Sequence, residues 1–126
     1  YDVAHNVEGI SAMIKTISNS HAYKKVVGLF SLKSDKNIKP ICNVIKNNFE
    51  IIILCHDKSG YLTRTTVLEK TLYENNIKCF SVSSVKKGVE ALEKYNDDYV
   101  KIIFGSHYIA EEVYNATGKH FDTTNN

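Results

Sequence analysis

The sequence predicts an α/β fold, namely a Rossmann-like, doubly wound and mainly parallel sheet with helices on both faces. Short apolar runs of strand length alternate along the chain with segments whose apolar side chains recur every three or four residues. The strand-like runs are rich in β-branched residues and apolar nearly throughout, which is typical of parallel strands covered on both faces. Strand–helix–strand connections are right-handed, so repeated units of this kind build one such sheet. The 126 residues, 43% of them hydrophobic and 24% charged, fit a single domain over residues 1–126.

The first predicted helix follows a polar turn near the beginning of the chain. Its inner face consists of apolar residues at helical spacing: Ile10, Met13, Ile14 and Ile17. Asn6 can accept a hydrogen bond from a first-turn N–H group and is the expected N-cap. If the chain immediately before Val3 adds a strand, the sheet has about five strands, which is the usual size.

Four apolar runs predict the remaining strands, at residues 23–30, 50–55, 78–82 and 99–104. Between the first two, one helix face is predicted by Ile38, Ile41, Cys42 and Ile45. Pro40 is tolerated near the start of this helix, because first-turn N–H groups lack helical partners in any case.

Polar residues mark the ends of the later helices. Thr63 is the expected N-cap of the next helix, which ends at Asn75 and Asn76, and Ser83 or Ser84 caps the one after it. Their inner faces, and that of a last helix, are predicted by apolar residues at helical spacing: Val67, Leu68, Thr71 and Leu72; Val85, Val89 and Leu92; Ile109, Ala110, Val113 and Tyr114. The polar tail at 122–126 is expected to be mobile.

Composition argues against several classes of partner. The formal net charge is +2 and Arg64 is the one arginine among sixteen basic residues, so we expect no nucleic-acid partner. No apolar run reaches about 18 residues and no signal peptide is visible, so we expect no membrane partner. The three cysteines form no CxxC pair, and Cys55 and Cys79 lie in apolar runs, which favours small core residues and a cytoplasmic location. The chain opens directly on a polar turn without Met, and we expect it to be a piece of a longer protein.

Ligands of doubly wound sheets bind beyond the carboxyl ends of the strands, where the winding direction reverses. This rule selects five loops, at 2–6, 31–37, 56–63, 83–84 and 105–107. In the first, Asp2, His5 and Asn6 precede a helix whose N–H groups attract anions, phosphate in particular, and Asp2 can accept hydrogen bonds from a sugar hydroxyl. In the last, Gly105 lets the backbone approach a ligand, and Ser106 offers a hydroxyl and an N–H group to a carboxylate. Both sets also fit plain helix caps, and the residues alone leave the two alternatives open.

Several recognisable chemistries are absent from the sequence. It contains neither GxxxxGK[ST] nor GxGxxG, and it has no HExxH, paired CxxC or GxSxG. The five histidines lack the spacing of a ligand set, so no metal site is expected in this chain. The residues by themselves predict a Rossmann-like domain with an edge that can bind an anion or a nucleotide.

The stretch Asp2-x-Ala4-His5-Asn6 resembles the D-x-A-H-N motif of folylpolyglutamate synthase and dihydrofolate synthase, enzymes of the wider Mur ligase group. Further short segments match the family's motifs in the same order, and together they cover essentially the whole chain. Residues 27–30 followed by 34–36 are similar to the family's V-x-G-x and D-K stretch, and Arg64 stands where the family often has an arginine. Residues 103–108 followed by 111–113 are similar to its closing G-S-L-Y and E-V segment, with His107 where an apolar residue is usual.

The resemblance implies the C-terminal domain of an ATP-dependent ligase. Such enzymes phosphorylate a carboxylate of folate or dihydropteroate, and the amine of L-glutamate attacks the acyl phosphate. The resemblance gives Asp2 and Asn6 a role in ATP binding, His5 a catalytic role near the phosphates, and Ser106 with Gly105 a role in binding the incoming amino acid. It places the P-loop and most Mg²⁺ ligands in a central domain that this chain lacks. It also implies a monomer, and an isolated domain without activity.

Two alternatives stay open beside the folate ligase. One is the C-terminal domain of another Mur-type amino-acid ligase, and the other is a non-catalytic Rossmann-like nucleotide-binding module. The sequence does not decide between dihydrofolate synthase, folylpolyglutamate synthase and a bifunctional enzyme, because the pteridine pocket would lie outside this chain. The contributions of Lys36, Arg64 and His107 are also left open.

Overall fold

The computed structural model describes residues 2–3, 7–20, 25–33, 37–46, 48–56, 63–105 and 122–123. The helices and strands follow in this order: β1 (Asp2–Val3), α1 (Val7–Ser20), β2 (Lys25–Phe30), α2 (Ile38–Ile45), β3 (Ile51–Cys55), α3 (Thr65–Glu74), β4 (Cys79–Val82), α4 (Val85–Glu93), β5 (Tyr99–Phe104) and β6 (Asp122–Thr123). The helix predicted over Ile109–Tyr114 lies outside the described residues.

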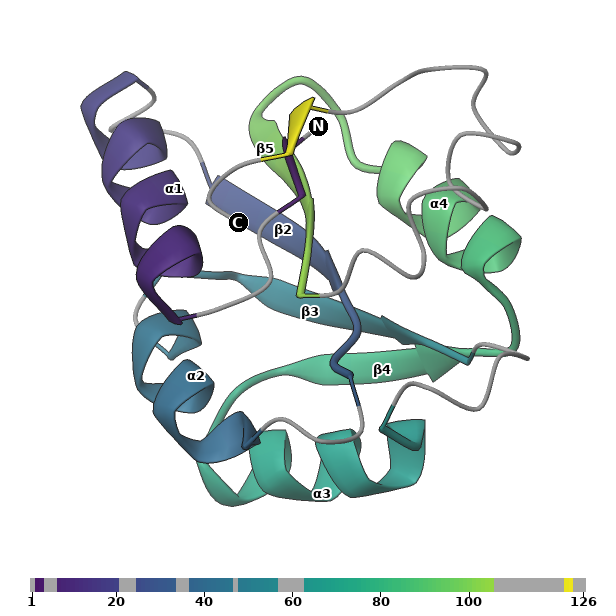
Figure 1. Cartoon of the computed structure of the whole chain (residues 1–126). Coiled ribbons are helices and arrows are strands. Elements are labelled where there is room, and N and C mark those ends of the chain that lie inside the picture. Colours follow the sequence, from purple (N-terminus) through teal and green to yellow (C-terminus); the bar gives the residue numbers. More distant parts are fainter. Residues whose placement is uncertain are drawn as a thin grey trace.

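Four parallel strands form the main sheet in the order β4-β3-β2-β5 (Figure 1). The chain moves from β2 through β3 to β4 at one edge, and then returns to place β5 on the other side of β2. The winding direction therefore reverses between β2 and β5, as a doubly wound sheet requires. The predicted α/β class and parallel sheet are confirmed.

Helices cover both faces of this sheet (Figure 1). On one face, α1, α2 and α3 contribute buried residues to a cluster that also contains Phe30 and Phe104. On the other face, α4 packs on β2 and β3 through a second cluster that includes Leu29, Val85 and Val89. Successive residues of a strand point to opposite faces of the sheet. Because helices cover both faces, the strands bury side chains on both sides, as their nearly continuous apolar sequence predicts.

A small second sheet lies beside β5. Its strands β1 and β6 pair in parallel, with Asp2 opposite Asp122 and Val3 opposite Thr123, and β1 lies against β5. Figure 1 shows the two short strands in dark purple and yellow. The expectation of a fifth strand near Val3 is met by β1, but its hydrogen-bonded partner is β6 and the main sheet has four strands among the described residues.

The mobility predicted for the tail at 122–126 is wrong for its first two residues, which form β6. Polar side chains favour a solvated tail, yet the backbone of any extended segment can satisfy its N–H and C=O groups by pairing with another strand. The partner strand, β1, lies about 120 residues earlier in the chain, a separation that local sequence patterns do not report.

One predicted helix cap is confirmed and another is wrong. Ser84 is the N-cap of α4, and its hydroxyl oxygen accepts a hydrogen bond from the Lys87 N–H group at 3.1 Å. Thr63 is not the cap of α3, because the N-cap is Arg64, which makes no side-chain cap bond. Instead, the Thr63 N–H group donates to the Leu32 carbonyl oxygen at 2.6 Å, which ties Thr63 to the segment that follows β2.

Asn75 and Asn76 end α3 as predicted. Asn76 has a φ of +59°, a left-handed conformation that asparagine tolerates better than most residues.

Candidate functional site at the carboxyl ends of β2 and β5

The candidate site lies where the winding of the sheet reverses. Phe30, the last residue of β2, is opposite Phe104, the last residue of β5. The pairing continues one residue further, because the Ser31 N–H group donates to the Phe104 carbonyl oxygen at 3.3 Å. Ser31 and Gly105 are therefore neighbours at the carboxyl edge, the position at which open α/β sheets bind their ligands.

Only glycine fits at position 105. Its φ is +107°, a backbone conformation that side chains rarely adopt. A Cβ atom at this position would overlap the Ser31 carbonyl oxygen and would lie 2.8 Å from the Phe30 ring. The sequence predicts that the Gly105 backbone approaches a ligand, which stays a prediction; among the described residues its close neighbour is the Ser31 backbone.

Ser31 is the buried polar residue of this edge. Its relative exposure is 1%, and its hydroxyl oxygen has no hydrogen-bond partner among the described residues. Position 31 falls in one of the predicted ligand loops, at 31–37, but the sequence assigns it no role of its own. The available signal was a hydroxyl directly after an apolar strand at the reversal point, and a loop residue is normally solvated.

The other predicted site residues are described only in part. Asp2 belongs to β1, which lies beside β5, while its side chain is not among the described groups. His5, Asn6 and Ser106 lie outside the described residues. The structure thus places the backbone of Asp2 next to β5, the strand that leads to Gly105, and the side-chain roles of these four residues stay predictions.

Of the three residues whose role the sequence leaves open, the structure describes only one. Lys36 and His107 lie outside the described residues. Arg64 is the exposed N-cap residue of α3, as its position at the opening of the third helix indicates.

The three cysteines, all among the described residues, form no disulfide and pack in or against the core. Cys42 and Cys55 are buried, and burial raises the pKa of the Cys42 thiol above its ordinary value. Burial also raises the pKa of the half-buried Cys79 thiol, with a smaller contribution from the nearby Glu69 carboxylate. Raised pKa values keep Cys42 and Cys79 in the protonated form at neutral pH, and a thiol in this form is a poor nucleophile and a poor metal ligand.

The part of the chain that the structure describes contains no group of three or more His, Cys, Asp or Glu side chains that could hold a metal ion. None of the helices in that part has the length and apolar character needed to cross a bilayer.

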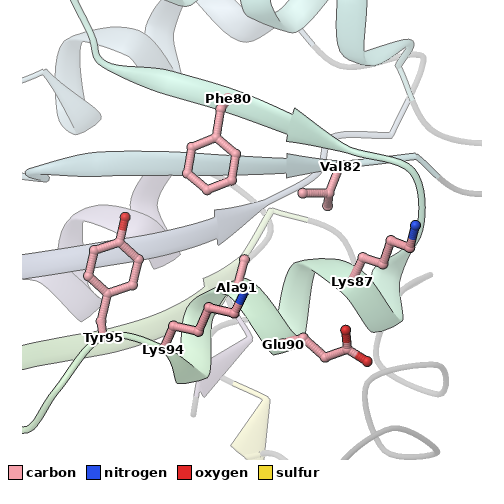
Figure 2. A pocket seen from close by; sticks show the side chains of 7 residues that line it. All are labelled: Phe80, Val82, Lys87, Glu90, Ala91, Lys94 and Tyr95. Carbon is pink, nitrogen blue, oxygen red and sulfur yellow. The ribbon is translucent and has the colours of Figure 1, made fainter.

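A groove lies at the far edge of the sheet, between β4 and α4, with a volume of about 500 Å³. Figure 2 shows Phe80 and Val82 projecting from β4, with Tyr95 just after α4 and charged side chains at the rim. The residues that line it are Phe80, Val82, Lys87, Glu90, Ala91, Lys94 and Tyr95. Because β3 and β2 separate β4 from β5, this groove is distinct from the site at Gly105. No sequence pattern predicts this groove.

No protein-family model matches the sequence, and a search of curated proteins finds no match. Solved structures do match. A Mycobacterium tuberculosis folylpolyglutamate synthase complexed with ADP superposes with a TM-score of 0.82 at 19% identity, over 95% of this chain and 30% of that chain. E. coli FolC in complex with DHPP and ADP gives a TM-score of 0.78 at 19% identity, over 94% and 29% of the two chains. A Yersinia pestis bifunctional folylpolyglutamate synthase/dihydrofolate synthase, complexed with AMPPNP and Mn ion, gives 0.76 at 18% identity, over 93% and 28%.

These matches establish the fold. The chain spans less than a third of the length of each of these proteins, and its fold is that of one part of a folylpolyglutamate synthase. The resemblance seen in the sequence is confirmed at the level of the fold.

Proposed function

We propose that this chain, which has the fold of one part of folylpolyglutamate synthases, is the C-terminal domain of a longer ATP-dependent folate ligase. In that protein it forms half of the ATP and glutamate site, facing a P-loop domain. The observation that carries the proposal is the match of almost the whole chain to less than a third of three folate ligases, combined with the D-x-A-H-N pattern over residues 2–6.

The reaction of such a ligase has two steps, phosphorylation of the acid and formation of the amide. A carboxylate oxygen of folate or dihydropteroate attacks the γ-phosphorus of ATP, the bond to the bridging oxygen breaks, and ADP leaves. The amine nitrogen of L-glutamate then attacks the carbonyl carbon of the acyl phosphate. Inorganic phosphate leaves, the amine loses a proton, and an amide bond remains. Water must be kept from the acyl phosphate, which explains the need for a second domain that closes over the site.

The proposed side-chain roles follow the chemistry of each group. Asp2 accepts hydrogen bonds from the nucleotide, with Asn6 as an amide partner, and His5 provides a donor near the transferring phosphate. Ser106 and the backbone at Gly105 bind the carboxylate of the incoming amino acid. The closeness of β1 to β5 supports a single site for these groups, because it brings the segment that carries Asp2 beside the strand that leads to Gly105.

Magnesium supplies charge neutralisation on the phosphates when it is bound. The described residues offer no cluster of ligands for it, so under this proposal the ion is held mainly by the P-loop domain.

The test is a substrate assay with the full-length protein. We expect ADP release that requires both L-glutamate and either dihydropteroate or a reduced folate, and the preferred pteridine distinguishes the two synthase activities. Turnover with another amino acid and a cell-wall precursor would indicate a different Mur-type ligase. Nucleotide binding without any turnover would indicate the non-catalytic module.

Residues 1–126 alone should not turn over substrates, because half of the site is missing. The measurement is glutamate-dependent ATP hydrolysis by the isolated chain, with the full-length protein as the positive control. Turnover by these residues alone would refute the two-domain arrangement.

Two substitutions separate the proposed subsites in the full-length enzyme. Asp2→Ala should mainly impair the use of ATP, and Ser106→Ala should mainly impair the use of glutamate. Steady-state kinetics with each substrate varied in turn distinguish the two effects, and equal, negligible effects of both substitutions would remove the site assignment.

A further inference from the structure

The Ser31 hydroxyl is an unusual group for the interior of a folded chain. It is buried, and its oxygen has no hydrogen-bond partner among the described residues. Buried polar groups in native proteins are nearly always paired, and an unpaired one costs free energy. The Ser31 hydroxyl is therefore a candidate hydrogen-bond partner for a bound ligand.

The position of Ser31 indicates where that partner binds. Val27 and Leu29 belong to the core cluster beneath α4, and strand residues two apart point to the same face. Ser31 follows Leu29 by two residues and continues the pairing of β2 with β5, so its side chain lies on the α4 face at the carboxyl edge. Gly105, which directly follows β5, is its neighbour.

The same face and edge carry positive charge. Helix α4 begins just after the carboxyl end of β4, and its Gly88 packs against Leu29. Lys86 is exposed in its first turn, which contains no acidic residue, whereas the exposed Lys87 lines the separate groove between β4 and α4. The charge of Lys86 and the helix dipole both favour a negatively charged ligand near this edge.

We infer that the Ser31 hydroxyl donates a hydrogen bond to an oxygen of an anionic group bound between the ends of β2 and β5. This inference rests on the proposed function and adds a ligand contact to those assigned to Asp2, His5, Asn6, Gly105 and Ser106. The group is a carboxylate of the incoming amino acid or a phosphate of the nucleotide, since both present charged oxygens that form strong hydrogen bonds with a hydroxyl.

The test compares Ser31→Ala with Ser81→Ala in the full-length protein. Both changes remove one hydroxyl, but that of Ser81 already donates to Glu69 at 2.7 Å and lies on the edge strand β4. Ser31→Ala should raise the KM of one anionic substrate by about 10- to 100-fold, as the loss of a hydrogen bond to a charged group implies. A higher KM for glutamate alone identifies the amino-acid carboxylate as the group bound by Ser31. A higher KM for ATP alone identifies a nucleotide phosphate. Ser81→Ala should change neither value.

The melting temperature of the ligand-free protein provides a second readout. Ser31→Ala should leave it unchanged or raise it, because the substitution removes an unpaired buried polar group. A fall in melting temperature, or two unchanged KM values, would show that Ser31 serves the fold or holds a structural water, and would overturn the inference.

Failure of the proposed function can be told apart from failure of this inference. If the full-length wild type ligates no glutamate, inorganic phosphate and glutamate are tested singly for thermal stabilisation of wild type and Ser31→Ala, since a ligand that binds the folded state raises its stability. Stabilisation of the wild type alone by either anion supports the Ser31 contact without the ligase reaction. Equal responses of the two proteins, or none, overturn it.

Discussion

Replacing Gly105 with alanine should destabilise the chain strongly, because two independent costs meet at this position. The φ of +107° strains any residue that has a Cβ atom, at about 1–3 kcal/mol. The new methyl group would also overlap the Ser31 carbonyl oxygen and the Phe30 ring, which are parts of the buried β2–β5 edge. Overpacking of this kind costs about 1–3 kcal/mol. The sum is about 2–6 kcal/mol, a large share of the 5–15 kcal/mol that is typical of a whole domain.

The measurement is urea unfolding followed by circular dichroism, with Gly88→Ala as the matched control. A Cβ atom at Gly88 would lie 2.7 Å from the Cδ1 atom of Leu29, the mobile end of a side chain. Gly88 also lies within α4, where alanine is favoured over glycine by about 1 kcal/mol, so the two effects nearly cancel. We expect Gly88→Ala to stay within about 1 kcal/mol of wild type. A loss below about 1 kcal/mol for Gly105→Ala would refute the claim that only glycine fits there.

Three further substitutions test other parts of the structure. Phe104→Ala removes a ring whose centroid lies 5.0 Å from that of Phe49, and it should cost about 3–5 kcal/mol in urea unfolding; a loss under about 1 kcal/mol would contradict this packing. Ser84→Ala should cost about 1 kcal/mol by losing the cap of α4, and no loss would argue against that cap. Glu69→Gln should lower the pKa of the Cys79 thiol and speed its alkylation at pH 8, and an unchanged rate would exclude the electrostatic contribution. Because the folded-state pKa of Cys79 is raised, the stability it contributes should be complete below its ordinary value of 9.0 and lost as the pH rises through the folded value.

Much of the fold follows from local patterns that physical chemistry makes reliable. A run such as Ile51–Cys55 is β-branched and apolar, and the structure buries it in the centre of the sheet. The alternation of strands and helices predicts the parallel sheet but not its strand order, and the reversal between β2 and β5, which locates the candidate site near Gly105, comes from the structure.

Other features depend on contacts between distant parts of the chain. The pairing of β1 with β6 joins the two ends of the sequence. Thr63 is not the cap of α3 because the helix begins only at Thr65, and the N–H group and hydroxyl of Thr63 donate instead to the carbonyl oxygens of Leu32 and Lys33, some thirty residues earlier. The burial of Ser31 is likewise a property of the folded edge, because a serine after a strand is ordinarily solvated. The roles of His5, Asn6 and Ser106 rest on the family resemblance and on residue chemistry.

Transfer of oxygen from the acid substrate to phosphate tests the proposed ligase chemistry most directly. The full-length protein is supplied with ATP, glutamate and dihydropteroate or folate whose carboxylate oxygens carry ¹⁸O, and the released phosphate is analysed by mass spectrometry. An acyl phosphate intermediate leaves one carboxylate oxygen on the phosphate, so labelled phosphate should appear in an amount equal to the ADP. Glutamate-dependent ADP release with unlabelled phosphate would contradict the acyl phosphate route, and with it the ligase function proposed for this chain.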